Sequence, residues 1–103
     1  MAVTLFMVRA TITKDKEAAF NKWYNEEHVP QVLQYNGAVS GRRYRRILGE
    51  DKYEYMALYE FASEDVFKTF QESGYLKELK AEYDKHFGSV SDRAGTGWVQ
   101  VFP

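Results

Sequence analysis

The chain has 103 residues, of which 45% are hydrophobic and 17% aromatic, a size and composition typical of one folded domain and too apolar for disorder. Its 14 basic and 15 acidic residues leave a net charge of -1, so no overall field would recruit nucleic acid or an anionic membrane. Cysteine is absent, which excludes disulfides and thiol chemistry, and no apolar stretch approaches the roughly 20 residues of a membrane-spanning helix. We therefore expect a single soluble domain over residues 1–103, located in the cytoplasm.

The first third of the chain predicts a strand followed by a helix. Residues 3–10 are rich in β-branched and large apolar side chains, which favour a strand. Thr13 is a plausible N-cap for the helix that follows. Apolar and aromatic residues recur there at helical spacing: Ala19, Phe20, Trp23 and Tyr24. Pro30 disfavours helical geometry at the residue before it, so we expect this helix to end or kink around residues 27–28.

The middle of the chain predicts a β-hairpin. A turn signal at residues 36–37, Asn-Gly, precedes a strand over about residues 39–47. Residues 49–52 form a polar connection, and residues 53–61 are strong strand formers throughout. Alternation along this last strand separates an aromatic face from a mixed one.

The last third predicts helix and then strand. Ser63 has the character of an N-cap with acidic residues behind it. Ser73 and Gly74 interrupt the helix, after which an apolar stripe resumes at spacings of three and four: Leu76, Leu79, Tyr83 and Phe87. Two glycines then precede a final strand over residues 98–102.

The predicted order is β-α-β-β-α-β, an α+β chain with the split-βαβ or ferredoxin-like topology. This topology has an antiparallel four-stranded sheet with both helices on one face. Yet large apolar residues lie on both faces of the first and third strands. They are Leu5, Met7, Met56 and Leu58 on one face, and Phe6, Val8, Tyr55, Tyr59 and Phe61 on the other. An uncovered apolar face of this size marks an interface, so we expect a two-fold homodimer packed sheet against sheet.

Residues 20–30, which read Phe-Asn-Lys-Trp-Tyr-Asn-Glu-Glu-His-Val-Pro, resemble the EthD-like branch of the dimeric α/β-barrel superfamily. The Asn-Gly turn that leads into Arg42-Arg43-Tyr44-Arg45 adds to the resemblance, and the element order matches over essentially the whole chain. The resemblance implies a dimer with a small-molecule pocket. Members of the superfamily include cofactor-free monooxygenases, lactone isomerases, polyketide cyclases and haem-degrading enzymes.

The resemblance also bears on individual residues. Relatives with lactone isomerase activity carry a histidine on the corresponding helix, which would be His28 here. Haem-degrading members use an asparagine on the first strand, and this strand has none. Cyclase members add a Tyr–His pair near the second helix; here Phe70 and Tyr75 lie nearby, but no histidine does.

His28 is the leading candidate for catalysis. A histidine exchanges protons near neutrality, which general acid–base catalysis requires. If the helix ends there, its dipole and the neighbouring Glu26 and Glu27 would favour the charged imidazolium. The structural alternative is a histidine that caps the helix or fixes the bend before Pro30.

His86, beside Asp84 and Lys85, could reach the mouth of a pocket, although a solvated capping role fits it as well. The two histidines lie far apart in sequence, and no spacing typical of metal ligands is present. We therefore expect no metal and no cofactor.

The densest charge in the chain surrounds Tyr44. On a strand, alternation places Arg43 and Arg45 on one face and Arg42 and Arg46 on the other. The structural interpretation is an edge strand whose charges discourage pairing with other chains, with glutamates on the neighbouring strand as ion-pair partners. The functional alternative is one guanidinium that points inward and binds a carboxylate or enolate oxygen. Arg9, alone in an apolar row, is a further candidate.

Aromatic side chains complete the predicted ligand site. Most are expected to pack in the core or the dimer interface, but tyrosine hydroxyls in an apolar cavity could orient a flat, oxygen-bearing ligand. The candidate substrate-binding residues are Trp23, Tyr24, Arg9, Arg43, Tyr44, Tyr55 and His86.

Three functions remain open from the sequence. The first is a cofactor-independent enzyme of the isomerase, cyclase or lyase type, which moves protons on an aromatic, lactone or polyketide-like metabolite with His28 as general acid or base. The second is a dimer that binds a small ligand without chemistry, or accompanies a catabolic enzyme. The third is a cofactor-free monooxygenase that deprotonates an electron-rich phenol. A small-molecule ligand is common to all three.

Overall fold

The computed structural model describes residues 3–103. The strands and helices have these bounds: β1 Thr4–Ala10, α1 Glu17–Trp23, α2 Val29–Leu33, β2 Ala38–Arg45, β3 Tyr55–Phe61, α3 Glu64–Gln71, α4 Gly74–Phe87 and β4 Arg93–Val99. A short 3-10 turn, Lys14–Lys16, precedes α1, and a π-helical turn, Tyr24–His28, joins α1 to α2. This confirms the predicted β-α-β-β-α-β order.

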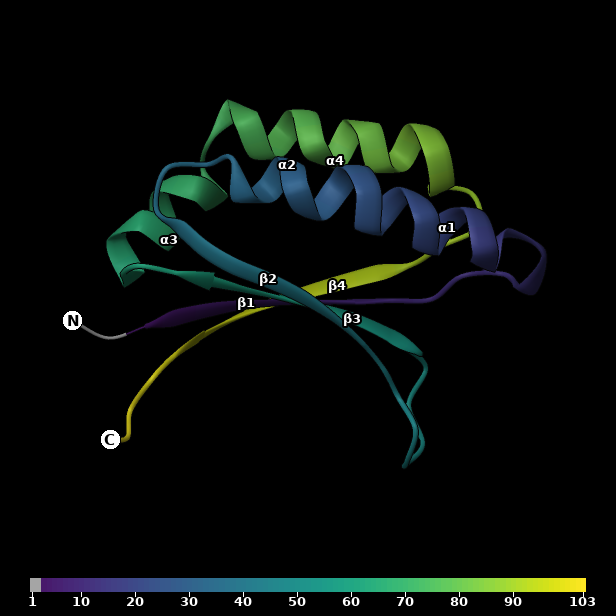
Figure 1. Cartoon of the computed structure of the whole chain (residues 1–103), viewed down its shortest axis with the longest axis horizontal. Helices are drawn as coiled ribbons and strands as arrows, with labels where there is room; N and C mark the ends of the chain where they lie inside the picture. Colours follow the sequence, from purple (N-terminus) through teal and green to yellow (C-terminus); the bar gives the residue numbers. More distant parts are fainter. Residues whose placement is uncertain (1–2) are drawn as a thin grey trace.

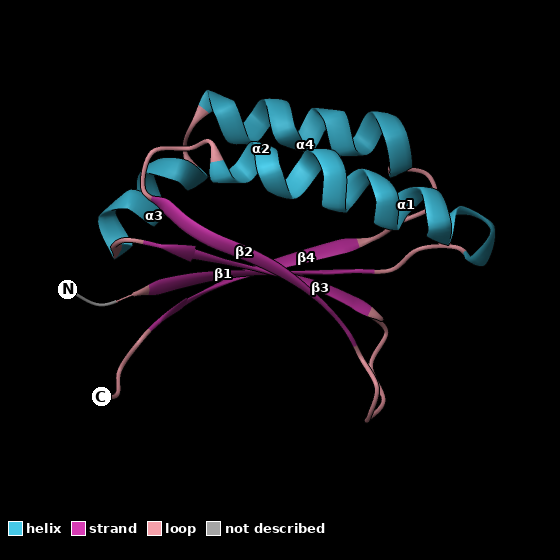
Figure 2. Cartoon of the chain, in the orientation of Figure 1, coloured by secondary structure: helices cyan, strands magenta, loops and turns pink. Residues whose placement is uncertain are grey.

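The four strands form one antiparallel sheet in the order β2-β3-β1-β4. All the helices lie on one face of this sheet, and the other face is bare (Figures 1 and 2). The α+β, ferredoxin-like fold predicted from the sequence is thereby confirmed. The edge position predicted for the arginine-rich strand β2 is also confirmed.

The first helix differs from its prediction. It does not end at residues 27–28, because α1, the π-helical turn and α2 run on as one helix through Leu33. The irregularity expected from Pro30 is present instead as the wider π turn, in which the Val29 N–H donates to the Tyr24 carbonyl. Pro30 has no N–H to donate, and a local widening of the helix accommodates its ring better than a regular turn does.

Of the two predicted N-caps, Ser63 and Thr13, only the first makes its hydrogen bond in the described structure. The Ser63 hydroxyl accepts a hydrogen bond from the Val66 N–H at 3.2 Å, which confirms the predicted cap. Ser73, which interrupts the helical pattern, caps α4 by accepting from the Leu76 N–H at 3.1 Å. Thr13 precedes the 3-10 turn but makes no side-chain cap.

The last strand begins earlier than predicted. It spans Arg93–Val99 and not residues 98–102, and it pairs with β1 along its whole length. Gly95 and Gly97 lie inside the strand because aromatic rings cover their inner face. A Cβ at Gly97 would lie 2.7 Å from the ring of Phe67. These glycines therefore allow close packing and do not mark a turn.

The core fills the space between the sheet and the helices. Its largest fully buried side chains are aromatic: Tyr24, Tyr59, Tyr83, Phe20, Phe61 and Phe70. The expected alternation on β3 is confirmed, since Ala57, Tyr59 and Phe61 face the helices and are buried. Among the described residues, no helix is long and apolar enough to cross a membrane.

Candidate functional site

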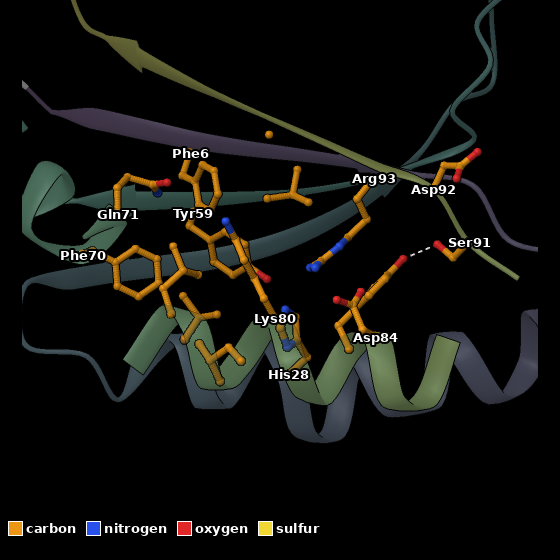
Figure 3. Close-up of a pocket in the computed structure, with 16 residues that line it drawn as sticks. Phe6, His28, Tyr59, Phe70, Gln71, Lys80, Asp84, Ser91, Asp92 and Arg93 are labelled. Carbon is orange, nitrogen blue, oxygen red and sulfur yellow. Dashed lines mark hydrogen bonds between the residues drawn. The ribbon is translucent and has the colours of Figure 1, made fainter. Parts of the chain in front are cut away.

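A cavity of about 450 Å³ lies between the helices and the inner face of the sheet (Figure 3). The π-helical turn, α2, α3 and α4 form one wall, and β1, β3 and β4 form the other. On the sheet side, one residue of the lining is a glycine. Gly95 lines the cavity, and a Cβ there would lie 3.0 Å from the ring of Phe6.

His28 lines this cavity from the π-helical turn and is 5% exposed. Its ring stacks on Trp23, with ring centroids 4.8 Å apart and planes at 19°, and meets Tyr24 edge-on at 4.9 Å. Two predicted substrate-binding residues therefore hold the predicted catalytic residue. The His28 Nδ1 atom is buried and has no hydrogen-bond partner within the described chain.

The charge state expected for His28 is wrong. Burial, the largest cause, and the nearby guanidinium groups of Arg93 and Arg43 together lower the pKa of the imidazole to about 4. The helix dipole does not act there, because the helix continues to Leu33, and Glu26 and Glu27 are exposed. His28 is therefore neutral at neutral pH, which suits a proton acceptor.

Arg93, which was not among the candidates from the sequence, brings a half-buried guanidinium to the cavity. It is the first residue of β4, and its guanidinium lies 3.5 Å over the centre of the Tyr83 ring. In Figure 3 its side chain extends from the sheet toward the helix layer that carries His28. Because the strand was expected to begin only at residue 98, its first inward-facing side chain was missed. Correct placement of Gly95 inside the strand would have found it, since residues 93 and 95 share a face.

Arg43 supports the cavity from the opposite edge of the sheet. Its guanidinium donates to Asn21 Oδ1 at 2.9 Å and to Asn25 Oδ1 at 3.0 Å, and it lies 4.5 Å over the Tyr24 ring. Helix and sheet are thus joined beside Tyr24. The inward orientation predicted for one guanidinium of the cluster is observed for Arg43.

Tyr55 extends this polar network outside the cavity. Its hydroxyl donates to Glu17 Oε2 at 2.5 Å and accepts from Asn21 at 3.3 Å. His86 is exposed, with its ring 5.4 Å from Trp23. Both residues lie on the helix side of the sheet, but neither lines the cavity.

Arg9 and Tyr44 lie on the bare face of the sheet, away from the cavity. Arg9 pairs with Met56 across the sheet, and its guanidinium contacts Asp51 at 3.4 Å. Tyr44 also opposes Met56 and is 45% exposed. The glutamate partners expected for the arginines of β2 are not among the ion pairs of residues 3–103, where Glu60 instead accepts from Ser40 at 3.0 Å.

Metal ligation has no support in this part of the chain. Across residues 3–103, no group of three or more histidine, aspartate or glutamate side chains is arranged to hold a metal ion.

Solved structures with similar folds cover nearly the whole chain. A DABB family protein with a ferredoxin-like fold from Mesorhizobium loti has a TM-score of 0.72 and 10% identity, and the match covers 99% of this chain and 100% of that one. An EthD family protein from Bacillus halodurans has a TM-score of 0.66 and 17% identity, with 93% and 97% covered. A proposed antibiotic biosynthesis monooxygenase from Nitrosomonas europaea has a TM-score of 0.68 and 13% identity, with 98% and 92% covered.

These similarities confirm the resemblance to the EthD-like and dimeric α/β-barrel proteins at the level of the fold. A comparison with curated proteins gives no match. The profile of a domain of unknown function, DUF4286, matches residues 3–92. The chain therefore belongs to the DUF4286 family.

Proposed function

We propose that this protein is a cofactor-independent enzyme that moves protons on a small metabolite, with His28 as the general base. The observation that supports this most is a cavity lined by a buried, neutral histidine whose Nδ1 atom has no hydrogen-bond partner among residues 3–103. The aromatic and aliphatic lining suits an aromatic, lactone or polyketide-like body.

The proposed reaction begins with transfer of a proton from a carbon next to a carbonyl, or from the hydroxyl of a phenol. His28 takes the proton, and the electron pair stays on the ligand as an enolate or phenolate. A pKa of about 4 makes His28 a weak base. As the proton moves, negative charge develops on the ligand beside Arg93, and this charge would stabilise the positively charged imidazolium of His28. The ligand and the base would therefore become charged in the same step. Return of the proton to another atom of the ligand completes an isomerisation.

A sheet-to-sheet homodimer is part of this proposal. The bare face carries the predicted apolar residues Leu5, Met7, Met56 and Leu58, all only partly buried. Trp98, on the same face, is 54% exposed. A second copy would cover this surface, as the family name of the M. loti fold neighbour suggests.

The test is ligand-induced thermal stabilisation against a panel of phenols, lactones and polyketide-like acids. Wild type, His28→Ala and the exposed-histidine control His86→Ala are screened in parallel. A ligand at a hundred times its dissociation constant adds about 2.7 kcal/mol of stability, a shift of several degrees. We expect hits for wild type and His86→Ala, followed by turnover that falls by about 10²–10⁴-fold in His28→Ala.

The other outcomes separate the remaining functions. A hit that His28→Ala weakens, with no chemical change of the ligand, would contradict catalysis and leave a binding protein. Oxygen consumption with a phenolic hit would favour a cofactor-free monooxygenase, the activity proposed for the N. europaea neighbour. A panel in which no compound stabilises the wild type would contradict the ligand cavity itself.

A further inference from the structure

The half-buried guanidinium of Arg93 in the cavity bears on the chemistry of the ligand, given the proposed function. Arg93 lines the cavity, yet none of the ion pairs of residues 3–103 includes it. The aspartates near it do not neutralise it, because Asp92 is paired with Lys52 at 3.1 Å and Asp84 is an exposed residue at the rim. Lys80, exposed at the same rim, balances the charge of Asp84.

Two polar groups of the cavity lining are hydrogen-bond donors without an acceptor. Tyr59 Oη and Gln71 Nε2 are buried, line the cavity wall and have no partner in the described chain. Tyr24 does not line the cavity itself, but its buried hydroxyl lies close enough to Arg93 for the guanidinium to influence its ionisation. A buried polar group without a partner costs stability, so these donors favour an incoming acceptor.

These tyrosines remain protonated at neutral pH. Burial raises the pKa of Tyr24 to about 12 and raises that of Tyr59 well above its usual range. Both hydroxyls can therefore donate toward an oxygen of the ligand. His28 Nδ1 differs from these hydroxyl donors, because a ring nitrogen of a neutral imidazole can also accept a hydrogen bond from the ligand.

The rest of the cavity is apolar. The hydrocarbon lining comprises Phe6, Val8, Val32, Phe70, Leu76 and Leu79. Figure 3 shows Phe6 and Phe70 on the side of the cavity away from Ser91 and Asp92. A ligand that fits both regions has an apolar body and one oxygen-bearing, negatively charged group.

We infer that this cavity selects an apolar organic monoanion, whose charged oxygen is bound by the Arg93 guanidinium and by the hydroxyls of Tyr24 and Tyr59. The inference rests on the proposed function, because it places the anion in the same cavity as His28. A guanidinium binds a carboxylate through two hydrogen bonds and a phenolate or enolate through one, and both are stronger than neutral hydrogen bonds.

The experiment compares two probes of nearly equal shape, 1-naphthoate and its neutral amide, 1-naphthamide, by calorimetric titration at pH 7.5. Wild type is compared with Arg93→Met and with Arg45→Met, which removes the same charge from the exposed end of β2. We expect wild type and Arg45→Met to bind naphthoate about tenfold or more tightly than naphthamide, since hydrogen bonds to charged groups are the stronger ones. In Arg93→Met the two probes should bind equally.

Other results of the same titrations also support or overturn the anion site. Binding of naphthamide to Arg93→Met shows that the variant is folded, and Tyr24→Phe should weaken naphthoate binding more than naphthamide binding. Equal binding of both probes by wild type, or a preference that persists in Arg93→Met, would overturn the anion site and leave the cavity as a small-molecule site. If wild type binds 2-naphthol as tightly as naphthoate at a pH where the naphthol is neutral, charge selection is also wrong. If no probe binds, both the inference and the proposed cavity fail.

Discussion

The neutral, buried state of His28 predicts a specific loss of stability on mild acidification. Its pKa is about 4 in the folded protein and about 6.5 when unfolded. Below pH 6.5 the unfolded chain therefore binds a proton that the folded protein does not, so the free energy of unfolding decreases as the pH falls. From pH 7.5 to pH 5 the linkage relation gives a loss of about 2 kcal/mol for this one group. Above pH 6.5 the stability is fully present.

Urea denaturation of wild type and His28→Gln at fixed protein concentration measures this loss. Glutamine does not titrate, so the variant should lose about 2 kcal/mol less than wild type between the two pH values, or roughly 10 °C less in Tm. The contributions of all other groups are common to both proteins and cancel in the difference. Parallel curves for the two proteins would refute the buried, neutral histidine.

Three further predictions concern the support of the site and the fold. Arg43→Met should raise the pKa of His28 in an NMR titration, because one of the cations that oppose its protonation is lost, whereas Arg42→Met on the bare face should not; an unchanged value contradicts the role of Arg43. Leu58→Lys should give a monomer in sedimentation where wild type and Leu33→Lys, on the helix layer, give a dimer; a dimer in all three excludes the bare face as the interface. Ser63→Ala should lower the free energy of unfolding by about 1 kcal/mol, and a loss no larger than that of the exposed Ser89→Ala would refute the cap.

The fold could be predicted from the sequence because local patterns and tertiary packing agree along most of the chain. Alternation in β1 and β3 gives the two faces of the sheet, and the serine at residue 63 gives a helix start. Gly95 and Gly97 misled the prediction, because glycine in a turn and glycine beneath an aromatic ring are indistinguishable without the ring. The same error hid Arg93.

The site could be predicted only in part. His28, Trp23 and Tyr24 share one helix, so their proximity follows from local spacing. The ionisation of His28 depends on burial by the sheet and on cations from β2 and β4, which are far away in sequence. Arg9 and Tyr44 were candidates for their chemistry, but strand alternation places them on the face opposite the cavity.

The central claim is that a small molecule binds beside His28, in the cavity between the helices and the sheet. Backbone amide shifts in an NMR titration with 1-naphthoate test this directly. The largest shifts should fall on His28, Tyr83 and Gly95, which line the cavity. Shifts confined to the bare face, at Met7 and Leu58, would contradict the claim.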